Sequence, residues 1–311
     1  MEIIEYSLGK NAGLKNATLA LGYFDGVHLG HRELILEGAR SAKENNGDFA
    51  VFTFTEESFN TKGGSLYSTE EKLTLLNSIG VNKVVLADFQ AVKDIPAEDF
   101  VKNVLVRDLG CSVAITGKDF RYGKNRCGTA DLLKADMERL GKRAFALDDI
   151  SLFGKKISTT RIKELLLRGE PDVARELLGV PYFERSPAVH GLGLGKKLGF
   201  PTVNFPDDKE FLRTGVYRTA VFAKGRLYNA VTNVGTCPTF NEREKHRETF
   251  IIDFFGDLYD EEIYVFYLGY LRDEIKFDSE EALTDQIKID VNRTIKENGE
   301  LKWQEIGLNL Q

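Results

Sequence analysis

Residues 18–44 read TLALGYFDGVHLGHRELILEGARSAKE, and this stretch decides the first half of the fold. The apolar run Thr18 to Tyr23 predicts a β-strand, and the run Leu29 to Glu44 has the periodicity of an amphipathic helix. A strand, a glycine-containing turn and a helix in direct succession are typical of a parallel α/β sheet. Ligands bind at such turns, so the turn between the two runs is the first candidate site.

The same alternation continues to about residue 150. Further strands are predicted at 49–54, 83–86 and 113–116, and further helices at 69–79 and 97–109. Strands that alternate regularly with helices indicate a parallel sheet covered on both faces. We therefore expect an α/β domain with a doubly wound parallel sheet that binds a nucleotide.

The pattern changes after residue 150. Two short helices are expected over 159–168, with Ser158 as N-cap, and over 171–178, which begins at Pro171 and ends at Gly179. Alternating strands at 216–223, 227–234, 248–255 and 263–270 predict a small antiparallel β-barrel. A closing amphipathic helix over 279–298 presents Leu283, Ile287, Val291 and Ile295 at four-residue spacing. We expect domains at 1–182 and 183–311.

Composition narrows the class of protein. The chain has 311 residues, of which 42% are hydrophobic and 29% charged, as in an ordinary globular protein of about two domains. Its 42 basic and 48 acidic residues give a net charge of −6, which disfavours nucleic acid and membrane surfaces as partners. Three widely spaced cysteines argue against a disulfide framework or a structural zinc site. Without a signal peptide or an 18-residue apolar stretch, we expect a cytoplasmic protein.

The turn before the first long helix contains two of the four histidines, His28 and His31. A helix N-terminus binds phosphate through its free N–H groups, and its field keeps a nearby imidazole neutral. The glycines of the turn let the backbone approach a ligand closely. A zinc site is the alternative interpretation, but no third Cys or His ligand lies nearby in sequence. The candidates for binding phosphate with the two histidines are Gly22, Phe24, Asp25, Gly26 and Gly30.

Two later segments place basic residues beside glycines or hydroxyls. ITGKDFRYGKNRCGT (115–129) follows a predicted strand, and ISTTRIKELL (157–166) begins a helix. This mixture suits contacts to a leaving pyrophosphate, although each segment alone is also typical of a solvated basic loop. The candidates are Gly117, Asp119, Ser158, Thr159 and Arg161.

GLGLGKKLGFPTVNF (191–205) is the candidate phosphate-binding segment of the second half, with a flexible hairpin as the alternative. It is not a Walker A loop, because the earlier glycine is missing and Lys197 replaces Ser or Thr. Thr202 and Asn204 face one side of a strand, which suits a magnesium ion. Glu248 begins a strand and is either a general base or a surface charge. The phosphate candidates are Gly191, Gly193, Gly195, Lys197 and Pro201.

Taken in order, GYFDGVHLGH, GKDFRYG, STTRIK, HGLGLGKKLGFPTVNF, NVGTCPTF and ETFIIDFFGDLYDEEI resemble the bifunctional bacterial riboflavin kinase/FMN adenylyltransferase family. The resemblance runs from about Thr18 to Ile295. It implies a nucleotidyltransferase domain followed by a riboflavin kinase barrel with a C-terminal helix. It also implies riboflavin, FMN and ATP as substrates, Mg²⁺ as the companion of ATP, and no tightly bound cofactor.

The same resemblance assigns roles to the candidate residues. Glu248 is the general base that activates riboflavin for phosphorylation to FMN, and Thr202 and Asn204 hold magnesium and phosphate. His28 and His31 stabilise the transition state in which FMN takes an adenylyl group from a second ATP, giving FAD and pyrophosphate. Both reactions depend on positioning and charge neutralisation. Arg272, in LRDEIKF, is expected either to contact the flavin or to brace the last helix.

Three features of the first half depart from the family pattern. Tyr23 stands where the family usually has Asn, and Lys163 stands where Arg is usual. FTFTEESF (52–59), with Glu56 and Glu57, replaces a Pro-His-Pro segment. Two alternatives therefore remain beside the bifunctional enzyme. One is a riboflavin kinase with a degenerate adenylyltransferase domain, and the other is a non-catalytic flavin-binding regulator.

Overall fold

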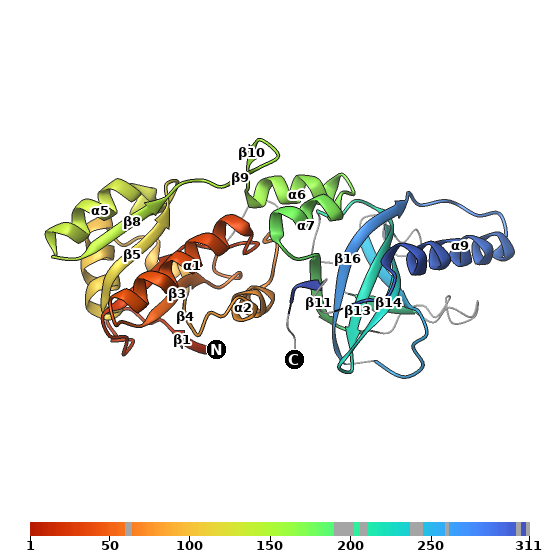
Figure 1. The fold of residues 1–311 in the computed structure, drawn as a ribbon, viewed down its shortest axis with the longest axis horizontal. Helices are drawn as coiled ribbons and strands as arrows, with labels where there is room; N and C mark the ends of the chain where they lie inside the picture. Colours follow the sequence, from red (N-terminus) through yellow and green to blue (C-terminus); the bar gives the residue numbers. More distant parts are fainter. Residues whose placement is uncertain are drawn as a thin grey trace. The chain divides into compact units, whose positions relative to one another are not determined.

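The computed structural model describes residues 1–59, 64–189, 202–205, 211–236, 245–258, 261–302 and 306–308. The chain forms two compact units, unit 1 (Met1–Thr159) and unit 2 (Thr160–Gln311), which Figure 1 colours from red to blue along the sequence. The two short helices at 159–178 therefore lie in unit 2, and the functional domain limits at 182 and 183 stay a prediction. No helix in the described part of the chain is long and apolar enough to cross a membrane.

Unit 1 is built on six parallel strands in the order β1-β4-β3-β2-β5-β8, which confirms the predicted parallel sheet. The chain adds strands on one side of β2 and then returns to its other side with β5. The carboxyl ends of β2 and β5 therefore flank the point where the strand order reverses, where ligands bind in open α/β sheets. The strands are β1 (Glu2–Glu5), β2 (Ala17–Leu21), β3 (Phe49–Phe54), β4 (Lys83–Ala87), β5 (Cys111–Gly117) and β8 (Arg143–Leu147).

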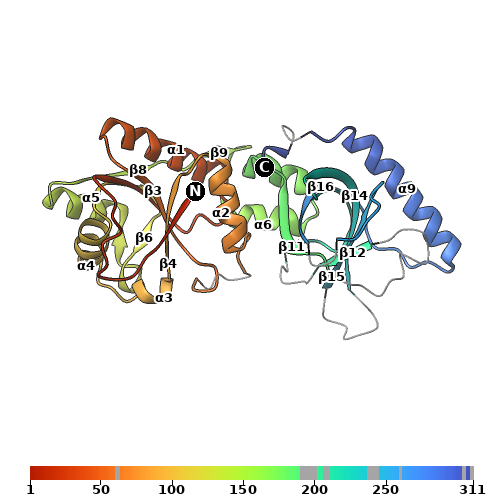
Figure 2. The same cartoon turned by 90° about the horizontal axis from the view of Figure 1, so that it is seen from below.

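Helices cover both faces of this sheet. Figure 2 shows α1 on one side and α3 and α4 on the other, and every residue of β2 is buried. The predicted helix at 97–109 is one turn of α-helix followed by a π-helix, η1. The helices are α1 (Leu29–Glu44), α2 (Thr69–Ser78), α3 (Phe89–Val92), α4 (Ala97–Asp99), η1 (Phe100–Asp108), η2 (Lys124–Arg126) and α5 (Ala130–Arg139). Two short hairpins complete the unit, β6 (Arg121–Tyr122) with β7 (Gly128–Thr129), and β9 (Ser151–Leu152) with β10 (Lys155–Lys156).

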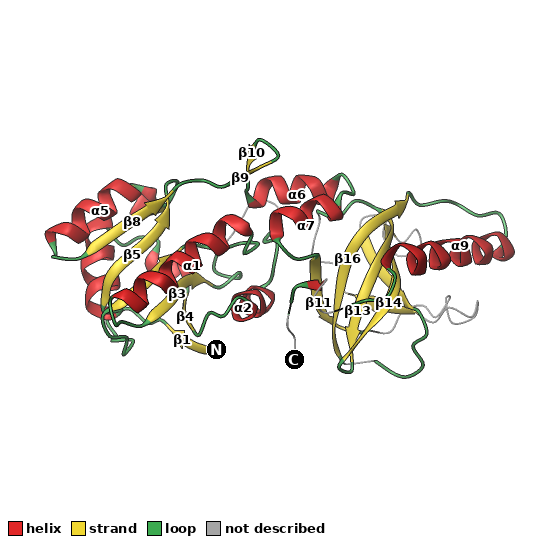
Figure 3. Cartoon of the chain, in the orientation of Figure 1, coloured by secondary structure: helices red, strands yellow, loops and turns green. Residues whose placement is uncertain are grey.

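Unit 2 is an antiparallel sheet of six strands in the order β11-β16-β13-β14-β15-β12, drawn in yellow in Figure 3. The sheet curls, and backbone hydrogen bonds between Val189 and Asn204 connect its two edges. The predicted antiparallel domain is thus confirmed. The strands are β11 (Tyr182–Pro187), β12 (Thr202–Phe205), β13 (Gly215–Ala223), β14 (Arg226–Thr236), β15 (Lys245–Ile251) and β16 (Glu262–Arg272), and the helices are α6 (Thr159–Leu167), α7 (Pro171–Leu178) and α9 (Glu280–Asn298).

One face of the curled sheet carries buried polar side chains. Arg247 and Glu184 form a buried ion pair of 2.8 Å, and the hydroxyls of two tyrosines, Tyr182 and Tyr267, donate to the same carboxylate. Beside them, three fully buried threonine hydroxyls form a hydrogen-bonded chain, Thr219, Thr232 and Thr249, with separations of 2.9 and 2.8 Å. Buried polar groups are tolerated when each has a hydrogen-bond partner, and here the buried polar side chains are hydrogen-bonded to one another.

The closing helix forms as predicted, but its inner face differs. Ser279 caps α9, and the buried residues of the helix are Asp290 and Thr294, whereas Ile295 is 43% exposed. A four-residue step turns an α-helix by about 400°, so three such steps rotate the stripe about 120° away from its starting direction. The four-residue spacing was therefore a wrong guide to the inner face at the end of the helix.

Candidate active sites

A cavity of about 720 Å³ lies in unit 1 where β2 and β5 end. Most sequence-predicted residues of the first half line it: Gly22, Phe24, Asp25, His28, Gly30, His31, Gly117, Asp119, Ser158 and Thr159. Gly26 belongs to the same turn, where its φ of +93° suits glycine. Arg161 lies in the first turn of α6, in unit 2. Five separate parts of the sequence, 21–34, 52–59, 89–100, 117–126 and 147–159, thus meet at one cavity.

The two histidines stack in parallel, with ring centroids 3.6 Å apart. His28 caps α1, because its Nδ1 accepts a hydrogen bond of 3.2 Å from the backbone N–H of His31. An accepting Nδ1 assigns the proton of the neutral ring to Nε2. Burial lowers the pKa of His28 to about 4, and burial followed by the charge of His28 holds the pKa of His31 well below its usual value. Both rings are therefore neutral hydrogen-bond donors at pH 7.

The turn that leads to the histidines is strained. Phe24 and Val27 have φ angles of +54° and +42°, which a bulky or β-branched residue rarely adopts, and both side chains are buried. Contacts from other segments hold the turn in this shape. The Asp25 carboxylate accepts from the backbone N–H of Leu66 at 2.8 Å, and the hydroxyl of Thr159 donates to the Asp25 carbonyl at 2.6 Å. Two predicted site residues thus fasten the turn itself.

Part of the cavity wall is aromatic. Phe59 lies against Phe89 with centroids 4.6 Å apart, and Tyr23 stacks on Phe59 at 4.1 Å. Such a wall suits a flat ring system, while the histidines provide a polar end. The sequence analysis missed this wall, although the aromatic residues of 52–59 and of FRYG were its signal. The aromatic lining residues are Tyr23, Phe24, Phe52, Phe54, Phe59, Phe89, Phe100, Phe120 and Tyr122.

A lysine that sequence reasoning also missed lies on the cavity lining. Lys156, in β10, contacts the carboxylates of Asp119 at 2.7 Å and Asp149 at 2.8 Å. The predicted Asp119 is therefore engaged by a cation from the β9–β10 hairpin. Lys156 is thus a cation of the cavity lining whose charge is balanced by the carboxylates of Asp119 and Asp149.

In unit 2, three neighbouring strands bring four polar side chains to one face. Asn204 of β12 and Asn233 of β14 are both cross-strand partners of Glu248 in β15. The Thr202 hydroxyl donates to Glu248 Oε1 at 2.5 Å. Cross-strand partners share a face, so Glu248 lies between two amides and a hydroxyl. Asn233 was missed by the sequence analysis, although its motif NVGT was the signal.

The oxygen atoms of this cluster suit a hard cation. Hydroxyl and amide oxygens are among the ligands of Mg²⁺, and Thr202 and Asn204 supply one of each, with the Glu248 carboxylate beside them. The Asn204 amide nitrogen is buried and has no hydrogen-bond partner within the described residues. No group of three His, Cys, Asp or Glu side chains in the described part of the chain could hold a metal by itself. The cluster therefore fits a cation that shares its ligands with phosphate.

Two family models match the chain, one for each half. The FAD synthetase model matches residues 10–161 and the riboflavin kinase model matches residues 178–297. A bifunctional riboflavin kinase/FMN adenylyltransferase from Haemophilus influenzae is 33% identical over 94% of this chain and 97% of its own. Its namesake from Bacillus subtilis is 31% identical over 90% of this chain and 92% of its own. The chain belongs to the bifunctional riboflavin kinase/FMN adenylyltransferase family.

A solved structure supports this assignment of the fold. It is titled a macrolide-efflux protein from Streptococcus pneumoniae, and it matches with a TM-score of 0.84 and 28% identity over 96% of this chain and 100% of that one. The two family models and the two relatives confirm the family resemblance read from the motifs. With two matched domains, this family member carries both halves of the bifunctional enzyme.

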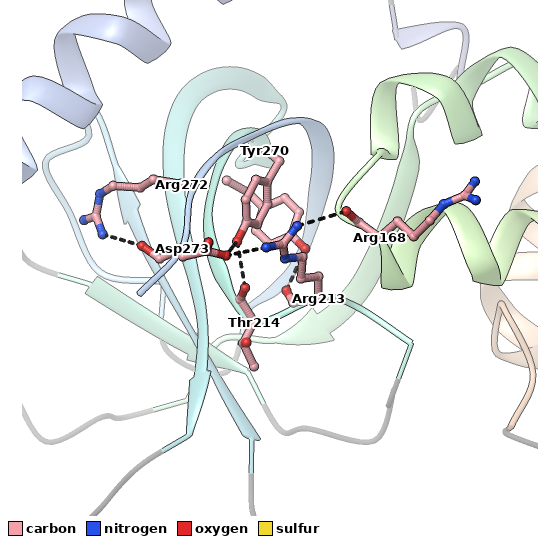
Figure 4. A network of polar contacts seen from close by, with 7 residues as sticks. Arg168, Arg213, Thr214, Tyr270, Arg272 and Asp273 are labelled. Atoms are coloured by element: carbon pink, nitrogen blue, oxygen red, sulfur yellow. Dashed lines mark hydrogen bonds and ion pairs between the residues drawn. The ribbon is translucent and has the colours of Figure 1, made fainter. Parts of the chain in front are cut away.

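Arg272 braces the last helix of this family member. Its guanidinium makes three hydrogen bonds to the Asp290 carboxylate of α9, at 2.7, 3.0 and 3.1 Å. Figure 4 shows its neighbour Asp273 in contact with Arg213 and the hydroxyl of Tyr270, and Arg272 itself donates to the Asp273 carbonyl at 3.0 Å. Of the two expected roles, the structure shows the brace, and contact with flavin stays a prediction. The candidates Gly191, Gly193, Gly195, Lys197 and Pro201 lie outside the described residues.

Proposed function

We propose that this protein makes FAD from riboflavin and ATP in two successive reactions, each performed by the residues of one unit. The observation that carries the proposal is the presence of two separate sites with different chemistry in one chain. Unit 1 offers neutral imidazoles and an aromatic wall, and unit 2 offers a carboxylate among magnesium-type ligands. Riboflavin, FMN and ATP are the small-molecule substrates.

Glu248 is the general base of the phosphorylation. Its carboxylate takes the proton from the 5′-hydroxyl of riboflavin as that oxygen attacks the γ-phosphorus of ATP and ADP leaves. The Thr202 hydroxyl fixes the orientation of the base through the 2.5 Å hydrogen bond to Oε1. Thr202, Asn204 and Asn233 would hold magnesium, which when bound neutralises phosphate charge.

His28 and His31 serve the adenylyl transfer. A phosphate oxygen of FMN attacks the α-phosphorus of ATP, and the bond to pyrophosphate breaks. Neutral imidazoles donate hydrogen bonds to the phosphate oxygens, and the N-terminus of α1 adds its backbone N–H groups. The aromatic wall, which includes Phe59 and Phe89, provides the surface on which the flavin ring lies.

A time course of flavins tests both reactions. Purified protein is incubated with riboflavin, ATP and magnesium, and the flavins are separated by chromatography. We expect FMN first and FAD later, and a second incubation that starts from FMN isolates the adenylyl transfer. FMN without FAD would support the kinase with a degenerate first domain. No conversion would support the non-catalytic regulator.

A further inference from the structure

Lys72 of α2 is a buried cation that no step above uses. It is 2% exposed, and its ammonium reaches the carboxyl ends of two strands of the sheet. Nζ donates to the carbonyl of Phe54, at the end of β3, at 2.6 Å. It also donates to the carbonyl of Tyr23, just after β2, at 3.3 Å. A lysine on a helix thus ties together the ends of two neighbouring strands.

The Tyr23 carbonyl is where the strained turn begins. The next residue, Phe24, has a φ of +54°, and the turn ends at His28. The same carbonyl also accepts from the Thr53 hydroxyl at 2.8 Å. Two donors on one oxygen fix the first peptide plane of the turn, and strain of this kind persists only where the surroundings over-determine it.

Charged and aromatic groups surround the ammonium. Burial lowers the pKa of Lys72 to about 8, and the carboxylates of Asp25, Glu56 and Glu57 oppose that fall. The ammonium lies 4.4 Å from the centre of the Tyr23 ring, whose face attracts a cation. Tyr23 and the Glu56–Glu57 pair are departures from the family pattern, and the Tyr23 ring lies against this ammonium while the two carboxylates act on it through their charge.

Lys72 also acts on the histidine pair. After burial and the charge of His28, the charge of Lys72 helps to hold the pKa of His31 well below its usual value. A charged Lys72 therefore adds to the burial that keeps His31 neutral, and it also fixes the turn. The group that faces Lys72 from α1 is this imidazole, and the groups from the strand ends are Asp25, Glu56 and Glu57.

We infer that Lys72 is a positioning residue for adenylyl transfer, whose ammonium holds the turn that carries His28 and His31, and that Tyr23, Glu56 and Glu57 keep this ammonium charged inside the protein. The inference rests on the proposed adenylyl transfer in unit 1. It gives a structural role to two departures from the family pattern, Tyr23 and the Glu56–Glu57 pair, which would otherwise suggest a degenerate domain.

The pH profile of FAD formation tests the inference. With FMN and ATP supplied, we expect kcat of the unaltered chain to fall as pH rises through about 8, where Lys72 loses its proton. Glu56→Gln with Glu57→Gln removes two opposing carboxylates, so the fall should begin at lower pH. Lys72→Arg stays charged and should lose the fall, and Lys72→Met should reduce kcat about tenfold or more at every pH with little change in KM for FMN. Lys43→Met, on the exposed side of α1, is the matched control.

FMN formation from riboflavin, measured on the same samples, is the internal control and should not respond to any of these variants. Unfolding does not explain the expected fall, because the unfolded chain holds the Lys72 proton more tightly and deprotonation favours the folded state. If Lys72→Arg fails to fold, the shift in the Glu56 and Glu57 variant still decides. An unaltered chain that forms FAD with no fall near pH 8, or a fall that the glutamine variant leaves in place, overturns the inference alone. An unaltered chain that forms no FAD overturns the proposed function as well.

Discussion

The two units solve the problem of holding reactive groups in different ways. In unit 1 the reactive side chains lie where a strained loop turn ends and helix α1 begins, and contacts from distant segments hold that loop turn in an unfavourable backbone shape. In unit 2 they lie on three adjacent strands, and the register of the sheet alone brings them together. A turn can place groups inside a cavity, where burial changes their protonation. Strand register places the reactive groups side by side on one face of the sheet, where hydrogen bonds between them set their orientation.

The largest expected effect is the loss of one activity while the other is unchanged. Glu248→Gln keeps the size and the hydrogen-bonding ability of the side chain but removes the base. We expect FMN formation to fall about 10²- to 10⁴-fold, the usual contribution of a general base. FAD formation from supplied FMN should not change. A loss of both activities would contradict the assignment of Glu248 to one unit.

The converse substitution is His28→Asn. Asparagine can still cap α1, so the variant removes the imidazole and spares the helix. We expect FAD formation to fall about 10²- to 10³-fold, the usual loss when one preorganised donor is removed. FMN formation should be unchanged when it is measured with riboflavin and ATP. A variant with full FAD formation would remove His28 from the site.

Stability should respond differently to polar groups inside and outside the sheet of unit 2. Glu184→Gln leaves Arg247 as a buried charge without its partner, which typically costs about 3–5 kcal/mol. Lys224→Met breaks the exposed pair with Glu261 and should cost about 0–1 kcal/mol. Denaturant unfolding of both variants measures the difference. Equal losses would contradict the role given to the buried pair.

Unit 1 should be sensitive to acid because of His28. Its pKa is lowered from 6.5 to about 4 in the folded state, so between these pH values the unfolded chain binds the extra proton. Stability is therefore fully present above pH 6.5 and is lost as the pH falls toward 4, by about 3 kcal/mol for this group. Thermal unfolding at several pH values should show this loss, and His28→Asn should show a smaller one, because His31 still titrates with a lowered pKa.

The smallest expected effect concerns Arg272. Arg272→Lys replaces a two-pronged contact with a single one, and Asp290→Asn weakens the same pair from the other side. We expect each to cost about 1 kcal/mol of stability and to leave KM for riboflavin unchanged. A large rise of KM in Arg272→Lys but not in Asp290→Asn would show that Arg272 contacts the flavin.

Local sequence predicted the elements of unit 1 well. The bounds of α1 and β3 are those expected, because capping and periodicity are local properties. The short edge strands of the sheet were not predicted. β1 has only two apolar residues between its glutamates, which is shorter than the run that marks a strand, whereas the apolar run 144–147 of β8 was a signal that was missed. In unit 2, β15 ends at Ile251 because Asp253 turns with a φ of +56°, which alternation of residues does not reveal.

The candidate site was predictable where its residues share a motif. The histidine turn is contiguous in sequence, and so are Thr202 and Asn204. Lys72 was not predictable, because a lysine in a helix usually faces solvent and nothing nearby shows that two strand ends approach it. The aromatic wall was not predicted for the same reason, since its rings come from segments that only the fold brings together.

The chain of hydroxyls formed by Thr219, Thr232 and Thr249 limits how this sheet can evolve. Replacing the middle residue, Thr232, by valine leaves the hydroxyls of Thr219 and Thr249 buried without this partner, which costs about 1–3 kcal/mol for each unsatisfied group. Replacing all three by valine removes the unsatisfied groups and can be nearly neutral. Every path of single substitutions between these two states passes through an intermediate with a lone buried hydroxyl, which is less stable than either end. The three positions are therefore expected to change together among descendants of this chain, as a unit of inheritance rather than as independent sites.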